Sequence, residues 1–297
     1  MITRAARAKI NLTLDVLYKR DDGFHQVEMI MQALELADEL EFFLLPGGEI
    51  VLEVDDPRLP ADETNLAYRA VALLKETFQV KQGVRIVLKK AIPMAAGLAG
   101  GSADAAAVLA GLNELWNLQI SLAELEVLAA QLGSDIPFCL RGGTMLAVGR
   151  GEQLVSLPDF PACYVVLAKL PVGVPTPWVY GQYRSEAVAE RPDTQGVIRC
   201  LEAGDQQGVI RRLCNVLESV TIPAHPEIAL LKAKMLEYGA LASLMSGSGP
   251  TVFGLVDSQE KAESIARRLQ KETTAEIIVT KTGVKVGEEC GTSVIAN

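Results

Sequence analysis

Polar and apolar residues alternate strictly near the start of the chain. Over residues 8–16, every second side chain is apolar, and Lys9 and Asn11 share the polar side. A period of two is typical of a β-strand, because successive strand side chains point to opposite faces. We therefore expect a half-buried strand. On this segment alone, a solvated strand face is the simpler interpretation of Lys9 and Asn11.

The following region switches between helical and strand periods. Apolar residues recur at helical spacing over 67–74, after a capping-type run at 62–64. Residues 84–88 alternate as a strand. The alanine-rich segment 103–115 predicts a helix that begins at Ser102, since alanine has the highest helix propensity. Asp21-Asp22-Gly23 indicates a turn, and Ser121 with Glu124 forms a capping box for a helix that ends near Gly133.

The second half of the chain follows an apparent linker at Pro158–Pro161. From residue 163 the pattern predicts a strand, a helical region with Thr176 and Pro177 as N-cap and first residue, two strands, a helix and a last strand. That is the split βαβ order of ferredoxin-like domains. We expect an α+β protein with two domains, residues 1–157 and 158–297.

Composition excludes several classes of protein. The 297 residues are 49% hydrophobic and 22% charged, as in ordinary globular chains. A net charge of −9 does not provide the basic face that nucleic acid requires. No apolar run is long enough for a membrane span, and the first residues lack the apolar core of a signal peptide. Five cysteines without a C-x-x-C pair argue against zinc or a disulfide framework, and a reducing cytoplasm is the expected location.

The strongest local candidate for chemistry is the segment from Pro93 to Ala105, in which a strand ends, glycines follow and a helix begins. Its glycines allow close approach of an anion, and the helix start offers unpaired N–H groups with a favourable dipole. The loop is not a Walker A, G-x-G-x-x-G or G-x-S-x-G motif. Phosphate binding is the favoured interpretation, and a tight structural turn remains the alternative.

Three weaker candidates stand elsewhere. The glycine loop of residues 245–251 lies between two strands, where a plain hairpin turn is equally consistent. Asp135 follows a helix end, where a lone aspartate more often caps or turns the chain. His25 and His225 are too far apart in the sequence to form a metal-binding pair, so no metal ligand is predicted.

In combination, these segments resemble the GHMP kinases. The shared features are an N-terminal Lys/Asn strand, the P-x-x-x-G-L-x-G-G-S loop at 93–102 and the S-G-S-G-P-T loop at 246–251, in that order. A more specific match is the block Arg20-Asp21-Asp22-Gly23-Phe24-His25. With Leu36-Ala37-Asp38, Gly133–Phe138 and Pro175-Thr176-Pro177, it resembles the members that act on 4-diphosphocytidyl-2-C-methyl-D-erythritol.

The resemblance, which covers essentially the whole chain, implies a fold and a reaction. The expected fold is a ribosomal S5-like domain followed by a ferredoxin-like domain, with the active site in the cleft between them. ATP would phosphorylate the 2-hydroxyl of the methylerythritol part, in the non-mevalonate route to isoprenoids, with Mg²⁺ carried by the nucleotide. A monomer or weak homodimer that binds neither nucleic acid nor membrane is expected.

The resemblance also assigns residues to roles. Asp135 corresponds to the base that accepts the hydroxyl proton, and Lys9 to the cation that orients the hydroxyl. Cytosine is expected between Phe24 and Tyr180, with His25 at its polar edge. The expected ATP site comprises Asn65, Pro93, Ala95, Ala96, Gly97, Leu98, Ala99, Gly100, Gly101, Ser102 and Ala103. The expected substrate site comprises Asn11, Phe24, His25, Thr176, Tyr180, Gly247 and Ser248.

Two positions depart from the usual pattern of the family. Ala103 stands where relatives often have a second serine, which leaves Ser102, the backbone amides and the adjacent Asp104 to hold phosphate and metal. Phe24 replaces a tyrosine and keeps the ring. Homoserine or mevalonate kinase is a neighbouring alternative, against which the aromatic pair Phe24 and Tyr180 argues. A catalytically inactive relative is the other, against which the retention of Lys9 and Asp135 argues.

Overall fold

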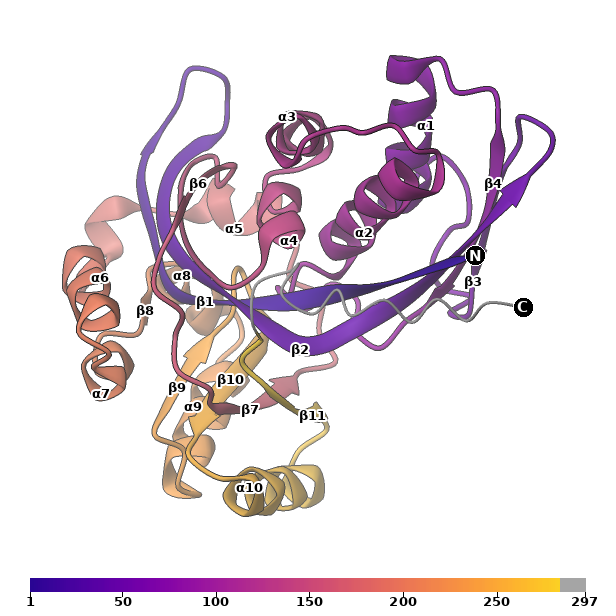
Figure 1. Ribbon diagram of the computed structural model, residues 1–297. Helices are drawn as coiled ribbons and strands as arrows, with labels where there is room; N and C mark the ends of the chain where they lie inside the picture. The colour runs from indigo at the N-terminus through magenta and orange to yellow at the C-terminus, as the bar shows by residue number, and fades with distance from the viewer. Residues whose placement is uncertain (284–297) are drawn as a thin grey trace.

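The computed structural model describes residues 1–283, which form two β-sheets flanked by helices (Figure 1). Residues 284–297, with Cys290 and the end of the predicted second domain, lie outside the described residues. Figure 1 shows helices α1–α4 above the two long strands β1 and β2, and the second sheet below them. Within residues 1–283, no helix is long and apolar enough to cross a membrane.

The first sheet is organised around the hairpin of β1 and β2, and the predicted turn at 21–23 joins these strands. The second strand is so long that its first half pairs with β5 and its second half with β4. The strand order is β3-β4-β2-β1-β8, with β5 beside β2 and β6 beside β5. The strands are β1 (Ile2–Lys19), β2 (His25–Leu45), β3 (Ile50–Val54), β4 (Gly83–Lys89), β5 (Thr144–Gly149), β6 (Gln153–Ser156) and β8 (Cys214–Asn215).

The interpretation of the polar side of β1 as a solvated face is wrong. Lys9, Asn11 and Thr13 are all buried, as are the apolar residues that alternate with them. Gly247, from the second half of the chain, donates its N–H to Asn11 Oδ1 at 3.1 Å and covers this face. Alternation correctly predicted the strand, but it could not show that another part of the chain packs over the polar side.

The helices of the first half pack on this sheet through small and branched apolar residues. The expected helix after residue 62 is α1, and its predicted face, Ala67, Ala70, Val71 and Leu74, is buried. The capping box of Ser121 and Glu124 is present. The alanine-rich helix begins at Gly100, not at the predicted Ser102, because Ala99 takes a left-handed conformation at the N-cap. The helices are α1 (Leu66–Phe78), α2 (Gly100–Leu115), α3 (Leu122–Leu132) and α4 (Ile136–Arg141).

The second sheet has the order β11-β7-β10-β9, with every neighbouring pair antiparallel. This is the predicted ferredoxin-like arrangement. The strands are β7 (Tyr164–Lys169), β9 (Ala242–Met245), β10 (Thr251–Val256) and β11 (Glu276–Lys281). The helices are α5 (Thr176–Gln182), α6 (Thr194–Glu202), α7 (Gln206–Ile210), α8 (Glu218–Ala224), α9 (Glu227–Glu237) and α10 (Gln259–Glu272), with a 3₁₀ turn, η1 (Ser185–Ala187).

One element of the second half was missed by the sequence interpretation. The two-residue strand β8 interrupts the region predicted as helical and pairs in parallel with β1. It is too short to show any period. Its pairing returns the chain to the first sheet, where Cys214 lies opposite Thr13 and Asn215 lies opposite Leu14.

Candidate active site

A cavity of about 970 Å³ lies where the two halves of the chain meet. Strand β1, the loop before α2, the start of α4, helix α5 and the loop between β9 and β10 all contribute to its lining. Of the residues that the sequence singled out for the ATP, substrate and catalytic sites, all but Leu98 and Ala103 line it. Segments far apart in the sequence therefore meet around one space that is large enough for small-molecule ligands.

Lys9 and Asp135 face each other inside this cavity. Lys9 Nζ donates to Asn11 Oδ1 at 2.8 Å and to the carbonyl of Gly97 at 3.1 Å, and lies 3.9 Å from Asp135 Oδ2. The Lys9 side chain is 5% exposed, whereas that of Asp135 is 32% exposed. Asp135 stands just before α4, but its side chain makes no capping hydrogen bond. Asp135 is thus the N-cap residue of α4 by its position, but its carboxylate lies toward Lys9 and the cavity instead of capping the helix.

The loop before α2 carries backbone strain. Ala95 and Ala99 have φ angles of 48° and 59°, in the left-handed region that non-glycine residues seldom adopt. Such strain costs on the order of 1–2 kcal/mol for each residue and persists where the surroundings impose it. The N–H groups of the first turn of α2 have no acceptor within the helix, and no acidic side chain stands in that turn. The loop therefore presents N–H donors and the positive end of the helix dipole to the cavity.

Gly97 joins this loop to the second half of the chain. Its φ is +71°, and a Cβ atom there would lie 2.3 Å from the carbonyl oxygen of Ser246. The Gly97 carbonyl accepts hydrogen bonds from Lys9 Nζ and from the Ser246 hydroxyl. The loop of residues 245–251 is the hairpin between β9 and β10, and it also lines the cavity through Gly247 and Ser248.

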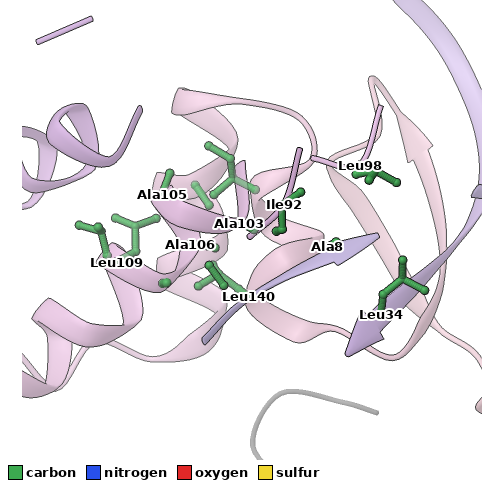
Figure 2. Packing of buried hydrophobic residues seen from close by; sticks show 14 of the residues in the cluster. Ala8, Leu34, Ile92, Leu98, Ala103, Ala105, Ala106, Leu109 and Leu140 are labelled. Carbon is green, nitrogen blue, oxygen red and sulfur yellow. The ribbon is translucent and has the colours of Figure 1, made fainter. Parts of the chain in front are cut away.

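Leu98 and Ala103 lie in the hydrophobic core instead of the cavity wall. Ala103 is 1% exposed and belongs to the same cluster as Ala8 of β1 and Leu140 of α4 (Figure 2). The side chain at this position thus packs between the helix and the sheet. Its replacement of the usual serine leaves Ser102 as the hydroxyl of this turn that lines the cavity.

Aromatic side chains gather at the end of the cavity formed by the β1–β2 hairpin and α5. The rings of His25 and Tyr180 lie 5.2 Å apart, and the Arg150 guanidinium lies 4.8 Å from the ring centre of Phe24. Phe24 is 51% exposed, so much of its ring is available for contact. Burial, and then Lys19, lowers the pKa of His25, which keeps its imidazole neutral at pH 7. Burial, and then Asp135, raises the pKa of Tyr180 and keeps its hydroxyl protonated.

Thr176 begins helix α5 without capping it. The N-cap of α5 is Pro175, not the predicted Thr176. The Thr176 hydroxyl lies 2.9 Å from the Ser248 hydroxyl. This contact ties α5 to the loop between β9 and β10. Two of the predicted substrate-site residues therefore hold each other in place at the cavity wall.

Several residues of the site were missed by the sequence interpretation. Lys90 lines the cavity and bonds to the buried carboxylates of Asp38 and Asp104, the latter at 2.7 Å. One oxygen of Asp104, Oδ1, has no hydrogen-bond partner. Burial, despite the opposing effect of Lys90, raises the pKa of Asp104 to about 7. Asp104 itself lines the cavity, and its Oδ2 is bonded to Lys90. Arg150, which also lines the cavity, is another missed residue of the site. Its position between two glycines is a pattern in the sequence that could have identified it.

Known proteins match the chain along nearly its whole length. Residues 65–143 match the GHMP kinases N terminal domain, and residues 197–274 match the GHMP kinases C terminal domain. A 4-diphosphocytidyl-2-C-methyl-D-erythritol kinase of Listeria monocytogenes serotype 4a is 49% identical over 269 residues, 91% of this chain and 92% of that protein. One of Brevibacillus brevis is 47% identical over 287 residues, 97% and 98% of the two chains.

A solved structure shows the same fold. The crystal structure of a 4-(cytidine 5'-diphospho)-2C-methyl-D-erythritol kinase superposes with a TM-score of 0.80 at 35% identity, and covers 95% of this chain and 100% of that one. The fold, the phosphate-type loop and these matches define an ATP-dependent kinase. The chain belongs to the GHMP kinases, and it is similar over more than nine tenths of its length to 4-diphosphocytidyl-2-C-methyl-D-erythritol kinases.

Proposed function

We propose that this kinase transfers the γ-phosphoryl group of ATP to the 2-hydroxyl of 4-diphosphocytidyl-2-C-methyl-D-erythritol, a step in the non-mevalonate synthesis of isoprenoid precursors. The observation that carries the proposal is the position of Lys9 and Asp135. Lys9 Nζ and Asp135 Oδ2 lie 3.9 Å apart in the cavity. The glycine-rich loop before α2 lines one part of this cavity, and the aromatic rings of Phe24, His25 and Tyr180 line another. The names of the relatives supply the substrate.

Asp135 and Lys9 have different roles at the substrate hydroxyl. The Asp135 carboxylate accepts the hydroxyl proton as the oxygen attacks phosphorus, while the bond from the γ-phosphorus to the β–γ bridging oxygen breaks and ADP leaves. Lys9, held by Asn11 and Gly97, places a positive charge where the alkoxide develops. Phosphoryl transfer requires mainly positioning and charge stabilisation, which these fixed groups supply.

The loop before α2 fits the nucleotide phosphates. Its first-turn N–H groups and the helix dipole offer anion contacts without a P-loop lysine. Asn65, which caps α1, and the Ser102 hydroxyl line the same cavity. Mg²⁺ carried by the nucleotide would neutralise phosphate charge. Among residues 1–283 no group of three or more His, Cys, Asp or Glu side chains could hold a metal ion.

The aromatic end fits a cytidyl group. Phe24 and Tyr180 offer ring faces, and a neutral His25 offers one donor and one acceptor to the polar edge of cytosine. Arg150, against the Phe24 ring, offers a cation for the diphosphate. Stacking accepts any base, so hydrogen bonds from His25 would supply selectivity for cytosine. Neither homoserine nor mevalonate has a ring that would use these contacts.

The division into domains follows from the same interpretation. The segment between β6 and β7 has no regular structure, and it carries the proposed boundary between residues 157 and 158. The cavity then lies between an N-terminal ATP-binding domain and a ferredoxin-like C-terminal domain. Both catalytic side chains come from the first domain, while Thr176, Tyr180, Gly247 and Ser248 come from the second.

Turnover tests the proposal directly. ADP release is measured with 4-diphosphocytidyl-2-C-methyl-D-erythritol and, in parallel, with mevalonate and homoserine. We expect turnover with the cytidyl substrate alone. Turnover with another alcohol would keep Lys9, Asp135 and the phosphate loop but remove the cytosine site. ATP binding without turnover of any of the three would favour an inactive relative.

A further inference from the structure

We propose that Asn215 is a positioning residue for Lys9, acting through Gly247 and Asn11. Asn215 lies in β8, is 4% exposed, and does not line the cavity. Its amide nitrogen donates to the carbonyls of Met245 and Gly247, each at 2.8 Å. Its Oδ1 accepts the N–H of Leu217 at 3.0 Å. Both donor hydrogens of the amide are thus used on the loop between β9 and β10.

The two carbonyls, of Met245 and Gly247, belong to the peptide groups on either side of the peptide that joins Ser246 to Gly247. The N–H of that middle peptide donates to Asn11 Oδ1 at 3.1 Å. Gly247 has a φ of +57°, a conformation in which glycine experiences no side-chain hindrance. Asn215 therefore fixes both neighbours of a peptide that could otherwise rotate, and so keeps its N–H on Asn11.

Asn11 passes this constraint to the Lys9 ammonium. The same Oδ1 that accepts from Gly247 accepts from Lys9 Nζ at 2.8 Å, and a second proton of Nζ goes to the Gly97 carbonyl at 3.1 Å. An ammonium has three donors, so one remains for the cavity, where Asp135 lies at 3.9 Å. Losing the Gly247 contact would leave the Asn11 amide with Lys9 and the sulfur of Met29, 3.3 Å from its nitrogen, and so would loosen one of the two anchors of Lys9.

Neighbouring side chains hold the same loop without touching this chain of bonds. Glu218 accepts the Met245 N–H at 2.9 Å and pairs with Lys232 at 2.6 Å, outside the peptides that flank Gly247. Glu218→Gln is therefore a matched control: it alters the support of the loop near β9 but keeps an acceptor of the same size. Asn215→Ser is the test variant, because a serine hydroxyl can still accept the Leu217 N–H but cannot reach the two carbonyls.

The inference rests on the proposed role of Lys9 and is tested by a double-mutant cycle. We measure kcat and the KM for ATP of Asn215→Ser, Asn11→Ala and the double variant, after thermal unfolding confirms that each is folded. We expect Asn215→Ser to lower kcat about 10- to 100-fold, the usual effect of a misplaced catalytic group, with the KM for ATP changed less than twofold. The double variant should be no slower than the slower single variant, because both act through one contact.

Three results would overturn the inference. The first is a double variant whose loss of kcat is the product of the two single losses, and the second is an unchanged kcat in Asn215→Ser. The third is a Glu218→Gln variant whose effect on kcat is equally non-additive with that of Asn11→Ala. Should Asn215→Ser fail to fold, Asn215→Asp takes its place, since it keeps the size and the Oδ1 acceptor. The cycle uses whichever alcohol the enzyme phosphorylates, so a wrong substrate leaves it intact. Lys9→Ala, measured alongside, separates the proposed role of Lys9 from that of Asn215. If Lys9→Ala keeps the full kcat, both proposals are overturned. If Lys9→Ala loses its kcat but the effects of Asn215→Ser and Asn11→Ala are additive, only the role of Asn215 is overturned.

Discussion

Lys9 Nζ lies 3.9 Å from Asp135 Oδ2, yet the two side chains are held very differently. Lys9 reaches this position from the buried middle of β1, and two hydrogen bonds fix its ammonium. Asp135 precedes α4, and its carboxylate is open to the cavity. A fixed cation beside a more accessible carboxylate suits a reaction in which only the carboxylate exchanges a proton with the incoming hydroxyl.

Asp135→Asn is expected to lower kcat about 10²- to 10⁴-fold, the typical contribution of a general base. The amide has nearly the same size but cannot accept the proton. The KM for either substrate should change far less, because the group acts mainly in the transition state. Steady-state kinetics with both substrates varied checks this, and a variant that kept near wild-type kcat would contradict the role of Asp135.

Phe24→Ala is expected to weaken binding of the cytidyl substrate by about 1–3 kcal/mol, the usual contribution of base stacking. ATP binding should be nearly unchanged, because Phe24 stands at the other end of the cavity. Phe24→Tyr is the matched control, since it keeps the ring. Titration calorimetry with each ligand measures both affinities. An equal loss for the two ligands would show that the cytosine is not at Phe24.

Two opposite substitutions in the loop before α2 are expected to differ in their effect on stability. Gly97→Ala places a Cβ atom 2.3 Å from the Ser246 carbonyl at a φ of +71°, so it should destabilise the fold by about 2 kcal/mol or more and raise the KM for ATP. Ala95→Gly relieves a left-handed alanine in the same loop and should leave stability within about 1 kcal/mol of wild type. Denaturant unfolding compares the two. A Gly97→Ala variant as stable as Ala95→Gly would contradict the described contact of the loops.

Asp104→Asn is expected to change how stability depends on pH. The raised pKa of Asp104, about 7, means that the folded state binds its proton more tightly than the unfolded chain does. Its stabilising contribution is therefore present below the unfolded pKa and is lost as pH rises toward 7. The variant lacks this loss, so its stability relative to wild type should increase by on the order of 2 kcal/mol from pH 5 to pH 8.

Urea unfolding of both proteins across this pH range measures the difference. Asp38 and Lys90 remain in the variant, so the local ion pair is kept. A difference in stability that stayed constant from pH 5 to pH 8, or that shrank as pH rose, would contradict the assigned direction of the pKa.

Much of the fold could be predicted from local pattern. The strand at residues 8–16, the capping box of Ser121 and most of the order of strands and helices after residue 163 all appear in the structure, because each depends on neighbours in the sequence. The candidate site residues could be named for the same reason, since they stand in short motifs. The proposed roles of those residues rest on the family and await the experiments above.

What local pattern could not predict depends on contacts between distant segments. A two-residue strand such as β8 has no period to detect, so nothing pointed to Asn215. Asp38, Lys90 and Asp104 form one buried cluster from three separate elements, and no motif joins them. Alternation alone favours a solvated polar side of β1, whereas the loop that contains Gly247 covers this side in the structure.

The amino-acid sequence by itself thus determined most of the helices and strands, which loop is the candidate for phosphate binding, and which family the chain resembles. These properties follow from side-chain spacing, backbone propensity and short motifs. Only the tertiary structure decided that Lys9 is buried, that it faces Asp135, and that Asn11 and Gly97 hold it there. Those facts depend on which surfaces the two sheets bury against each other, and burial is a property of the packed chain as a whole.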